Sequence, residues 1–209
     1  LLSILCVVFS NSALAATAPV NLSEAEQEWL NAHPTIRLAV DIDWAPFEFI
    51  DDDNQYAGMA AEYIGLVREK LGIEFTVEKE KPWSEVVASV KNGELDMFPS
   101  VVSTTQRREY VNFSKTYLSF PMVIVTSDQV AYVNGLKDLR HETVAVVRGY
   151  ATQDLLMKNH PDLNLYVADS VADALEKLSH GKVYAYIGNI ATVSHVIRRE
   201  GLTNIKISG

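Results

Sequence analysis

Three side chains suited to binding chemistry stand beside predicted strands and helices. Trp44 follows an apolar stretch, Trp83 comes just before a helical segment, and Arg107 follows the polar turn 103–106. An indole ring can stack on apolar or cationic groups, and a guanidinium can hold a carboxylate through two parallel hydrogen bonds. These residue types therefore predict a site that binds a small ligand.

Each of these residues also has a purely structural interpretation. The two indoles could pack in the core or at its rim, and Arg107 could form a structural ion pair. Pro46 favours a loop at Trp44, because proline has no N–H for regular strand pairing. Loops at the carboxyl ends of strands are where open α/β sheets bind ligands. The residues alone leave both interpretations open.

Known catalytic and metal-binding motifs are absent from the sequence. It contains no Gly-x-Ser-x-Gly, Gly-x-Gly-x-x-Gly, Walker or His-Glu-x-x-His pattern. The acidic run 51–54 departs from a calcium loop, because Tyr56 stands where that loop needs glycine. The five histidines have no metal-ligand spacing. We therefore expect no enzyme activity, no cofactor and no metal.

The composition is that of a folded, acidic protein. Hydrophobic residues make up 48% of the 209 residues, and the formal net charge is −9, so the chain can bury a core. There is no run of Lys and Arg, and phosphate binding requires a basic face. Nucleic acid is therefore not an expected partner.

Residues 1–15 are expected to be the remnant of a signal peptide. This stretch is apolar and ends in Ala13-Leu14-Ala15, a small-x-small cleavage pattern. The alternative, a membrane anchor, is weaker because a span needs about 20 apolar residues. Cys6, the one cysteine, lies inside this leader. Secretion of a chain that keeps no cysteine favours the bacterial periplasm.

Strands and helices alternate along the rest of the chain. Residues 16–34 read as a linker and an N-terminal helix that ends before Pro34. The alternation that follows predicts a parallel α/β layer, here called lobe one, over residues 35–126. Its elements are strands at 36–41, 73–77 and 95–102 and helices at 60–71 and 84–91.

A second alternation predicts another lobe. The polar stretch 127–135 reads as a crossing segment, so residues 127–209 are assigned to that segment and lobe two. The predicted elements are strands at 143–147, 163–167, 183–187 and 204–207 and helices at 152–158, 170–178 and 189–199. Two α/β lobes joined in this way predict a cleft between them, a usual place for a small ligand.

Several short motifs, in their order, resemble a known family. From residue 36 to 209 the chain is similar to the family 3 bacterial extracellular solute-binding proteins, whose fold is the two-lobed, type II periplasmic-binding-protein α/β fold. Residues 44–49 match the family's aromatic-x-Pro-Phe-x-Phe, and residues 93–96 match its Gly-x-x-Asp. Thr-Thr-Gln-Arg at 104–107 resembles its Thr-x-Glu-Arg, Val-Asn-Phe-Ser-Lys-Thr-Tyr at 111–117 resembles its Val-Asp-Phe-Ser-x-Pro-Tyr, and Val147-Arg148-Gly149 resembles its second-lobe strand-turn.

The resemblance implies a set of ligand-binding residues. Trp44 and Trp83 would enclose the ligand side chain, and Arg107 with the backbone near Ser100 would hold a carboxylate. Tyr150 and Asn189 would close on the ligand from lobe two. The full implied set is Trp44, Trp83, Ser100, Val102, Arg107, Arg148, Gly149, Tyr150 and Asn189.

Two departures from the family pattern bear on the ligand. Val102 stands where amino-acid receptors carry a threonine that bonds the α-carboxylate, and Asn189 stands where they carry an aspartate that pairs with the α-amino group. An ammonium left without that carboxylate would be destabilised on burial. A small organic acid or an amino-acid-like solute is therefore the expected ligand.

The N-terminal helix and the segments around Trp83 and Gly149 look most like one subgroup. These are the Venus-flytrap sensor domains of membrane-bound histidine kinases and diguanylate cyclases, so a membrane-embedded kinase, cyclase or transporter is the expected partner. The alternatives are a free receptor of an ABC transporter and the N-terminal domain of a lytic transglycosylase. By the resemblance, lobe one would be incomplete through truncation, with any membrane segment beyond Gly209.

Overall fold

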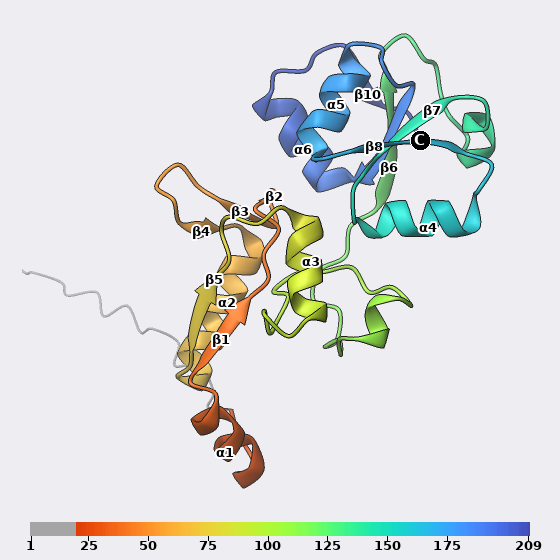
Figure 1. Ribbon diagram of the computed structural model, residues 1–209. Coiled ribbons are helices and arrows are strands. Elements are labelled where there is room, and N and C mark those ends of the chain that lie inside the picture. Colours follow the sequence, from red (N-terminus) through yellow and green to blue (C-terminus); the bar gives the residue numbers. More distant parts are fainter. Residues whose placement is uncertain (1–19) are drawn as a thin grey trace, which may run out of the picture.

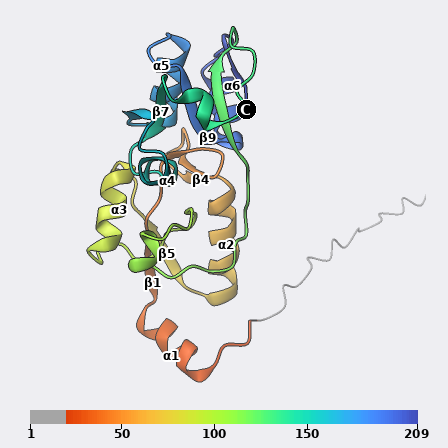
Figure 2. The ribbon, with the colours of Figure 1, turned by 90° about the vertical axis from the view of Figure 1, so that its right-hand side faces the viewer.

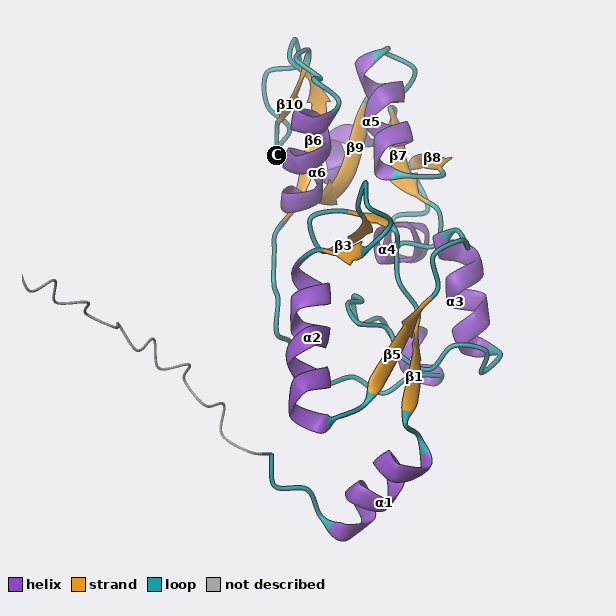
Figure 3. Cartoon of the chain, turned by 90° about the vertical axis from the view of Figure 1, so that its left-hand side faces the viewer, coloured by secondary structure: helices purple, strands orange, loops and turns teal. Residues whose placement is uncertain are grey.

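Two parallel strands form the centre of lobe one in the computed structural model, which describes residues 20–209 (Figure 1). β1 (Thr35–Leu38) pairs with β5 (Glu74–Val77). Successive side chains of a strand point to opposite faces, and Ile36 and Leu38 are accordingly buried. α2 (Met59–Leu71) and α3 (Trp83–Lys91) lie on either side of this pair (Figure 3).

A small antiparallel sheet lies at the end of lobe one that faces lobe two. Its strands are β2 (Asp43–Trp44), β3 (Glu48–Ile50) and β4 (Tyr56–Ala57), in that order. Figure 3 shows β3 directly below the helices of lobe two. Trp44 is therefore placed at the boundary between the lobes.

Lobe two is built on a five-stranded sheet with the strand order β10-β6-β9-β7-β8. β7 is parallel to β8 and to β9, whereas β6 is antiparallel to both of its neighbours, β9 and β10. The strands are β6 (Met122–Ser127), β7 (Thr143–Val147), β8 (Asn164–Ala168), β9 (Ala185–Asn189) and β10 (Ile205–Ile207). The helices are α4 (Ala151–Asn159), α5 (Val171–Ser179) and α6 (Ile190–Arg199).

Several predicted helix boundaries are confirmed, and their caps explain them. The Ser23 side chain accepts from the N–H of Glu26 in a capping box at the start of α1 (Glu24–Ala32). Ser170 accepts from the N–H of Asp173 at the start of α5. Gly72 ends α2 in the left-handed conformation, with φ 67°, which costs glycine little.

The prediction of a strand over residues 95–102 is wrong. This segment makes one isolated parallel bridge, between Met97 and Leu38. Pro99 removes a donor that a central strand needs, and Val102, expected to be buried, is 47% exposed. The segment reaches the lobe boundary as a loop.

Residues 122–126, assigned to lobe one from the sequence, pair in lobe two as part of β6. β6 lies between β10 and β9, so the chain crosses between the lobes before Met122. Figure 2 shows a long loop that rises from the 3-10 helix η1 (Arg107–Glu109), passes α2 and enters β6. Residues 127–135 instead belong to lobe two, where the N–H of Val133 donates to Ser208.

The expected signal peptide, residues 1–15, lies outside the described residues. Within residues 20–209, no helix is long and apolar enough to cross a membrane.

Gly58 offers a test of how α2 is joined to the small sheet. It has φ 106°, and an added Cβ would lie 2.5 Å from the carbonyl oxygen of Phe47, which accepts from the N–H of Ala60. We expect Gly58→Ala to lower the free energy of unfolding by about 2–4 kcal/mol, measured by urea denaturation. Gly65→Ala, inside α2 and with nothing within 4 Å of its Cβ, should raise it by about 0.5–1 kcal/mol.

Candidate ligand-binding site

A cavity lies between the lobes and is lined from both. The space between its walls, including open solvent at the mouth, is about 540 Å³. Only about 60 Å³ of it admits the centre of a water-sized sphere, so the cavity fits a small solute. Lobe one contributes Trp44 and Arg107, and lobe two contributes Tyr150 and Asn189.

The structure brings most of the residues implied by the resemblance to this cavity. Its lining includes Trp44, Trp83, Ser100, Val102, Arg107, Tyr150 and Asn189. Gly149 contributes a backbone carbonyl at the lobe boundary. Arg148 is not among the described lining residues: its Nε lies 3.2 Å from Oδ1 of Asp169 on the exposed surface. Direct contact of these residues with a ligand stays a prediction.

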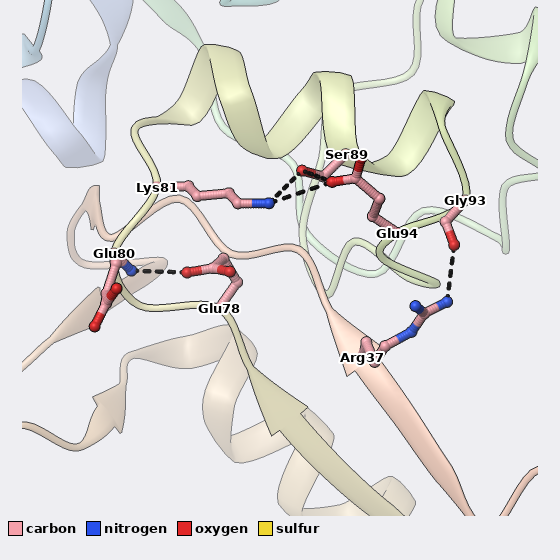
Figure 4. A network of polar contacts seen from close by, with 7 residues as sticks. All are labelled: Arg37, Glu78, Glu80, Lys81, Ser89, Gly93 and Glu94. Atoms are coloured by element: carbon pink, nitrogen blue, oxygen red, sulfur yellow. Dashed lines mark hydrogen bonds and ion pairs between the residues drawn. The ribbon is translucent and has the colours of Figure 1, made fainter.

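A polar network on lobe one fixes the loop that leads into Trp83 (Figure 4). Nζ of Lys81 donates to Oγ of Ser89 at 2.8 Å and lies 3.3 Å from the carboxylate of Glu94. Arg37 of β1 donates to a backbone carbonyl just after α3. Because both ends of α3 are tied down, Trp83 begins that helix in a defined position.

The carbonyl of Gly149 receives two hydrogen bonds from lobe one, here called the Gly149 contact. Nε1 of Trp83 donates to it at 2.9 Å and Nη2 of Arg107 at 3.0 Å. Nη1 of Arg107 donates to the carbonyl of Val102 at 2.8 Å. The guanidinium thus bonds to both lobes, and its carbon lies 5.5 Å from the ring centre of Trp83, a cation–π distance.

Tyr150 of lobe two lies against both indoles of lobe one. Its ring centre is 6.3 Å from that of Trp44 and 6.4 Å from that of Trp83, with steep interplanar angles. Edge-to-face pairs of this kind are favourable. A ligand that stacks on these indoles would therefore share them with Tyr150.

Sequence reasoning missed Asp41, a buried carboxylate in the cavity wall. Asp41 is 4% exposed, and its N–H donates to the carboxylate of Glu48 at 2.9 Å. Burial raises the pKa of Asp41 to about 6, although the Tyr150 hydroxyl and the N–H of Asp43 favour its charged form. Its position in the short segment that follows β1, three residues before Trp44, was the signal that could have identified it.

Several other lining residues were also missed, among them Met122, Tyr186 and Thr192. Met122 and Tyr186 belong to strands that read as plain core, and Thr192 lies in the first turn of α6. No sequence motif distinguishes them. The pairing of β6 with β9 places Met122 opposite Asn189, the N-cap of the helix that carries Thr192.

Two α/β lobes with a cavity lined from both, and side chains that bond across it, define a two-lobed domain like the periplasmic binding proteins. Residues 36–189 match the bacterial extracellular solute-binding proteins, family 3, and the chain belongs to this family.

Sensor proteins and transport-type binding proteins are both among its relatives. The virulence sensor protein BvgS of Bordetella pertussis is 27% identical over 186 residues, 89% of this chain and 15% of BvgS. The crystal structure of the BvgS periplasmic VFT2 domain has a TM-score of 0.79 at 27% identity, covering 91% of this chain and 81% of that domain.

Two further relatives are again a sensor domain and a binding protein. A crystal structure described as a histidine kinase sensor domain with similarity to periplasmic binding proteins has a TM-score of 0.81 at 25% identity, covering 86% of this chain and 78% of that one. The probable amino-acid-binding protein YxeM of Bacillus subtilis is 25% identical over 167 residues, 78% of this chain and 62% of YxeM.

The buried carboxylate of Asp41 makes stability depend on pH. Because folding raises its pKa from about 4 to about 6, ionisation destabilises the folded state, and this cost is absent below about pH 4 and complete above about pH 6. We expect Asp41→Asn to gain stability relative to wild type between pH 4 and 7.5, by up to about 3 kcal/mol. Urea denaturation at several pH values measures this. Asp52→Asn, which removes an exposed carboxylate, should show no such trend.

The Gly149 contact predicts how firmly the lobes are held together. Trp83→Phe keeps an aromatic ring but removes the Nε1 donor, and a hydrogen bond of this kind contributes about 1 kcal/mol. We expect the ratio of closed to open molecules to fall about fivefold, measured by energy transfer between dyes on the two lobes. Trp29→Phe changes an indole that is 52% exposed on α1 and should leave closure unchanged. Equal closure in both variants would contradict the role assigned to the Gly149 contact.

Proposed function

We propose that this chain is the periplasmic input domain of a transmembrane signalling protein, and that closure of its lobes on a small anionic solute is the signal. The observation that carries the proposal is the cavity itself, which takes Arg107 from one lobe and Tyr150 and Asn189 from the other. A solute in that position would contact both lobes and so favour the closed arrangement.

The relatives support the signalling part of this proposal. BvgS is a virulence sensor, and the matching structures include its periplasmic domain and a histidine kinase sensor domain. The chain spans about 15% of the length of BvgS. The signalling output is therefore proposed for a larger protein of that type.

A free transport receptor is the second candidate. It is favoured by the similarity to YxeM, of which the chain covers 62%. The two candidates differ in the phenotype of a gene deletion. Loss of a sensor abolishes a transcriptional response to the solute, whereas loss of a receptor abolishes uptake of the labelled solute.

Calorimetric titration of the protein with a panel of organic acids and amino acids tests solute binding. We expect at least one organic acid to bind and to raise the midpoint of thermal unfolding, because a ligand that binds only the folded state stabilises it. Arg107→Ala should weaken that binding by about tenfold or more, since it removes a charged donor from the cavity wall.

Arg148→Ala is the matched control. It also removes one guanidinium from the lobe boundary region, but that guanidinium faces Asp169 on the surface. We expect unchanged affinity. If Arg107→Ala binds as tightly as wild type, the ligand does not use Arg107, and if no solute binds, the proposed function is wrong.

A further inference from the structure

Tyr150 stands at a position where its own helix favours a different residue. It is the N-cap of α4, with extended backbone angles of φ −76° and ψ 150°, but its side chain makes no capping hydrogen bond. Serine, threonine, aspartate and asparagine are preferred there, because their oxygens accept from first-turn N–H groups, as Ser170 and Asn189 do in α5 and α6. The helix therefore gives no reason for a tyrosine, and the contacts of its ring supply one.

The ring of Tyr150 fills a part of the cavity that we call the indole compartment, bordered by Trp44, Trp83 and Asp41. Its centre lies 6.3 Å from the ring centre of Trp44 and 6.4 Å from that of Trp83. Burial and the nearby Asp41 carboxylate raise the pKa of the Tyr150 hydroxyl. The phenol is therefore neutral, and its hydroxyl favours the charged form of Asp41. Tyr150 thus contacts all three borders of the compartment.

The backbone that carries this ring is held against the same indole. Nε1 of Trp83 donates to the carbonyl of Gly149 at 2.9 Å, and a Cβ on Gly149 would lie 3.3 Å from Cδ1 of Trp83. The N–H of Gly149 donates to Oε1 of Gln153 at 2.7 Å, and the N–H of Tyr150 donates to the carbonyl of Val147 at 3.1 Å. Residues 149 and 150 therefore present the ring to the compartment whenever the lobes are together.

We propose that Tyr150 is a specificity-determining residue, whose ring takes the place beside Trp44 and Trp83 that a ring or a long side chain of a solute would need. This inference rests on the proposed function and adds the class of solute that the closed cavity admits. The free space beside Tyr150 is small. The fitting solute is therefore an acid of a few heavy atoms without a ring.

Removal of the ring tests this inference with a probe that imitates it. Tyr150→Ala deletes a group with the shape of phenol, and an internal cavity can bind a ring of matching size. We expect calorimetric titration with phenol to give a dissociation constant of about 1 mM or lower for Tyr150→Ala. Wild type, whose compartment is filled, should bind phenol at least about tenfold more weakly. Tyr150→Phe, which keeps a ring, should behave as wild type.

A second variant covers the case in which Tyr150→Ala does not fold. Tyr150→Ser also removes the ring, but it offers α4 the capping oxygen that the helix lacks, and this offsets part of the lost packing. It should bind phenol as Tyr150→Ala does, and phenol should raise the midpoint of thermal unfolding of both variants.

Tyr132→Ala is the matched control. It deletes the same group from lobe two, at a residue that is 68% exposed. It should bind phenol no better than wild type does.

Two carboxylates extend the test to the selection of solutes. Phenylacetate carries a ring and acetate does not. Tyr150→Ala should therefore bind phenylacetate about tenfold or more tightly than wild type does, because the ring gains a buried place. Acetate should bind the two proteins alike.

Phenol binding decides the inference. It is overturned if neither Tyr150→Ala nor Tyr150→Ser binds phenol, if wild type binds phenol equally well, or if Tyr150→Ala gains no affinity for phenylacetate. These results leave the proposed function standing if a solute of the organic-acid panel binds wild type. If phenol binds both variants but no solute of the panel binds wild type, the proposed function fails, and the exclusion of rings by Tyr150 stands.

Discussion

The arrangement of the two lobes depends on one backbone carbonyl. Trp83 and Arg107 both donate to the oxygen of Gly149, and each donor is itself held in place, Trp83 at the start of α3 and Arg107 by its bond to the carbonyl of Val102. A hydrogen bond between two prepositioned groups loses little conformational entropy when it forms. The Gly149 contact, together with the packing of Tyr150 on Trp44 and Trp83, therefore holds the faces that enclose the cavity.

The cavity combines two walls of different chemistry. Lobe one supplies two buried charged side chains, the Arg107 guanidinium and the Asp41 carboxylate. Each of them shifts the pKa of the other towards the charged form. Lobe two supplies the first turns of α4, α5 and α6. Charged side chains give directional bonds, whereas helix ends give a diffuse positive potential. A ligand between the walls meets both kinds of interaction only when the lobes are together.

The sequence predicted helices and their ends well where residues next to each other in the chain determine them. The apolar spacing and Gly72 define α2, and Ser170 defines the start of α5. It failed where the cause lies in tertiary structure: the 95–102 segment is as apolar as a strand, but Pro99 and a single bridge at Met97 leave it a loop. Trp44, Trp83 and Arg107 were identifiable by type and motif. Asp41 and Thr192 were not, because an aspartate or threonine becomes unusual only when folding buries it.

The acceptor at the lobe boundary is a main-chain atom, presented by a glycine with φ 72°. A point mutation can exchange a side chain but cannot delete a peptide oxygen. The acceptor of this hydrogen bond is therefore present whatever residue stands at position 149. The two donors, Trp83 and Arg107, are side chains of the cavity wall, so mutation can act on the contact only through them or through the backbone position of Gly149. An ester linkage in place of the peptide bond that follows Gly149 would weaken this acceptor without altering any side chain, and would also remove the N–H of Tyr150, which donates to the carbonyl of Val147.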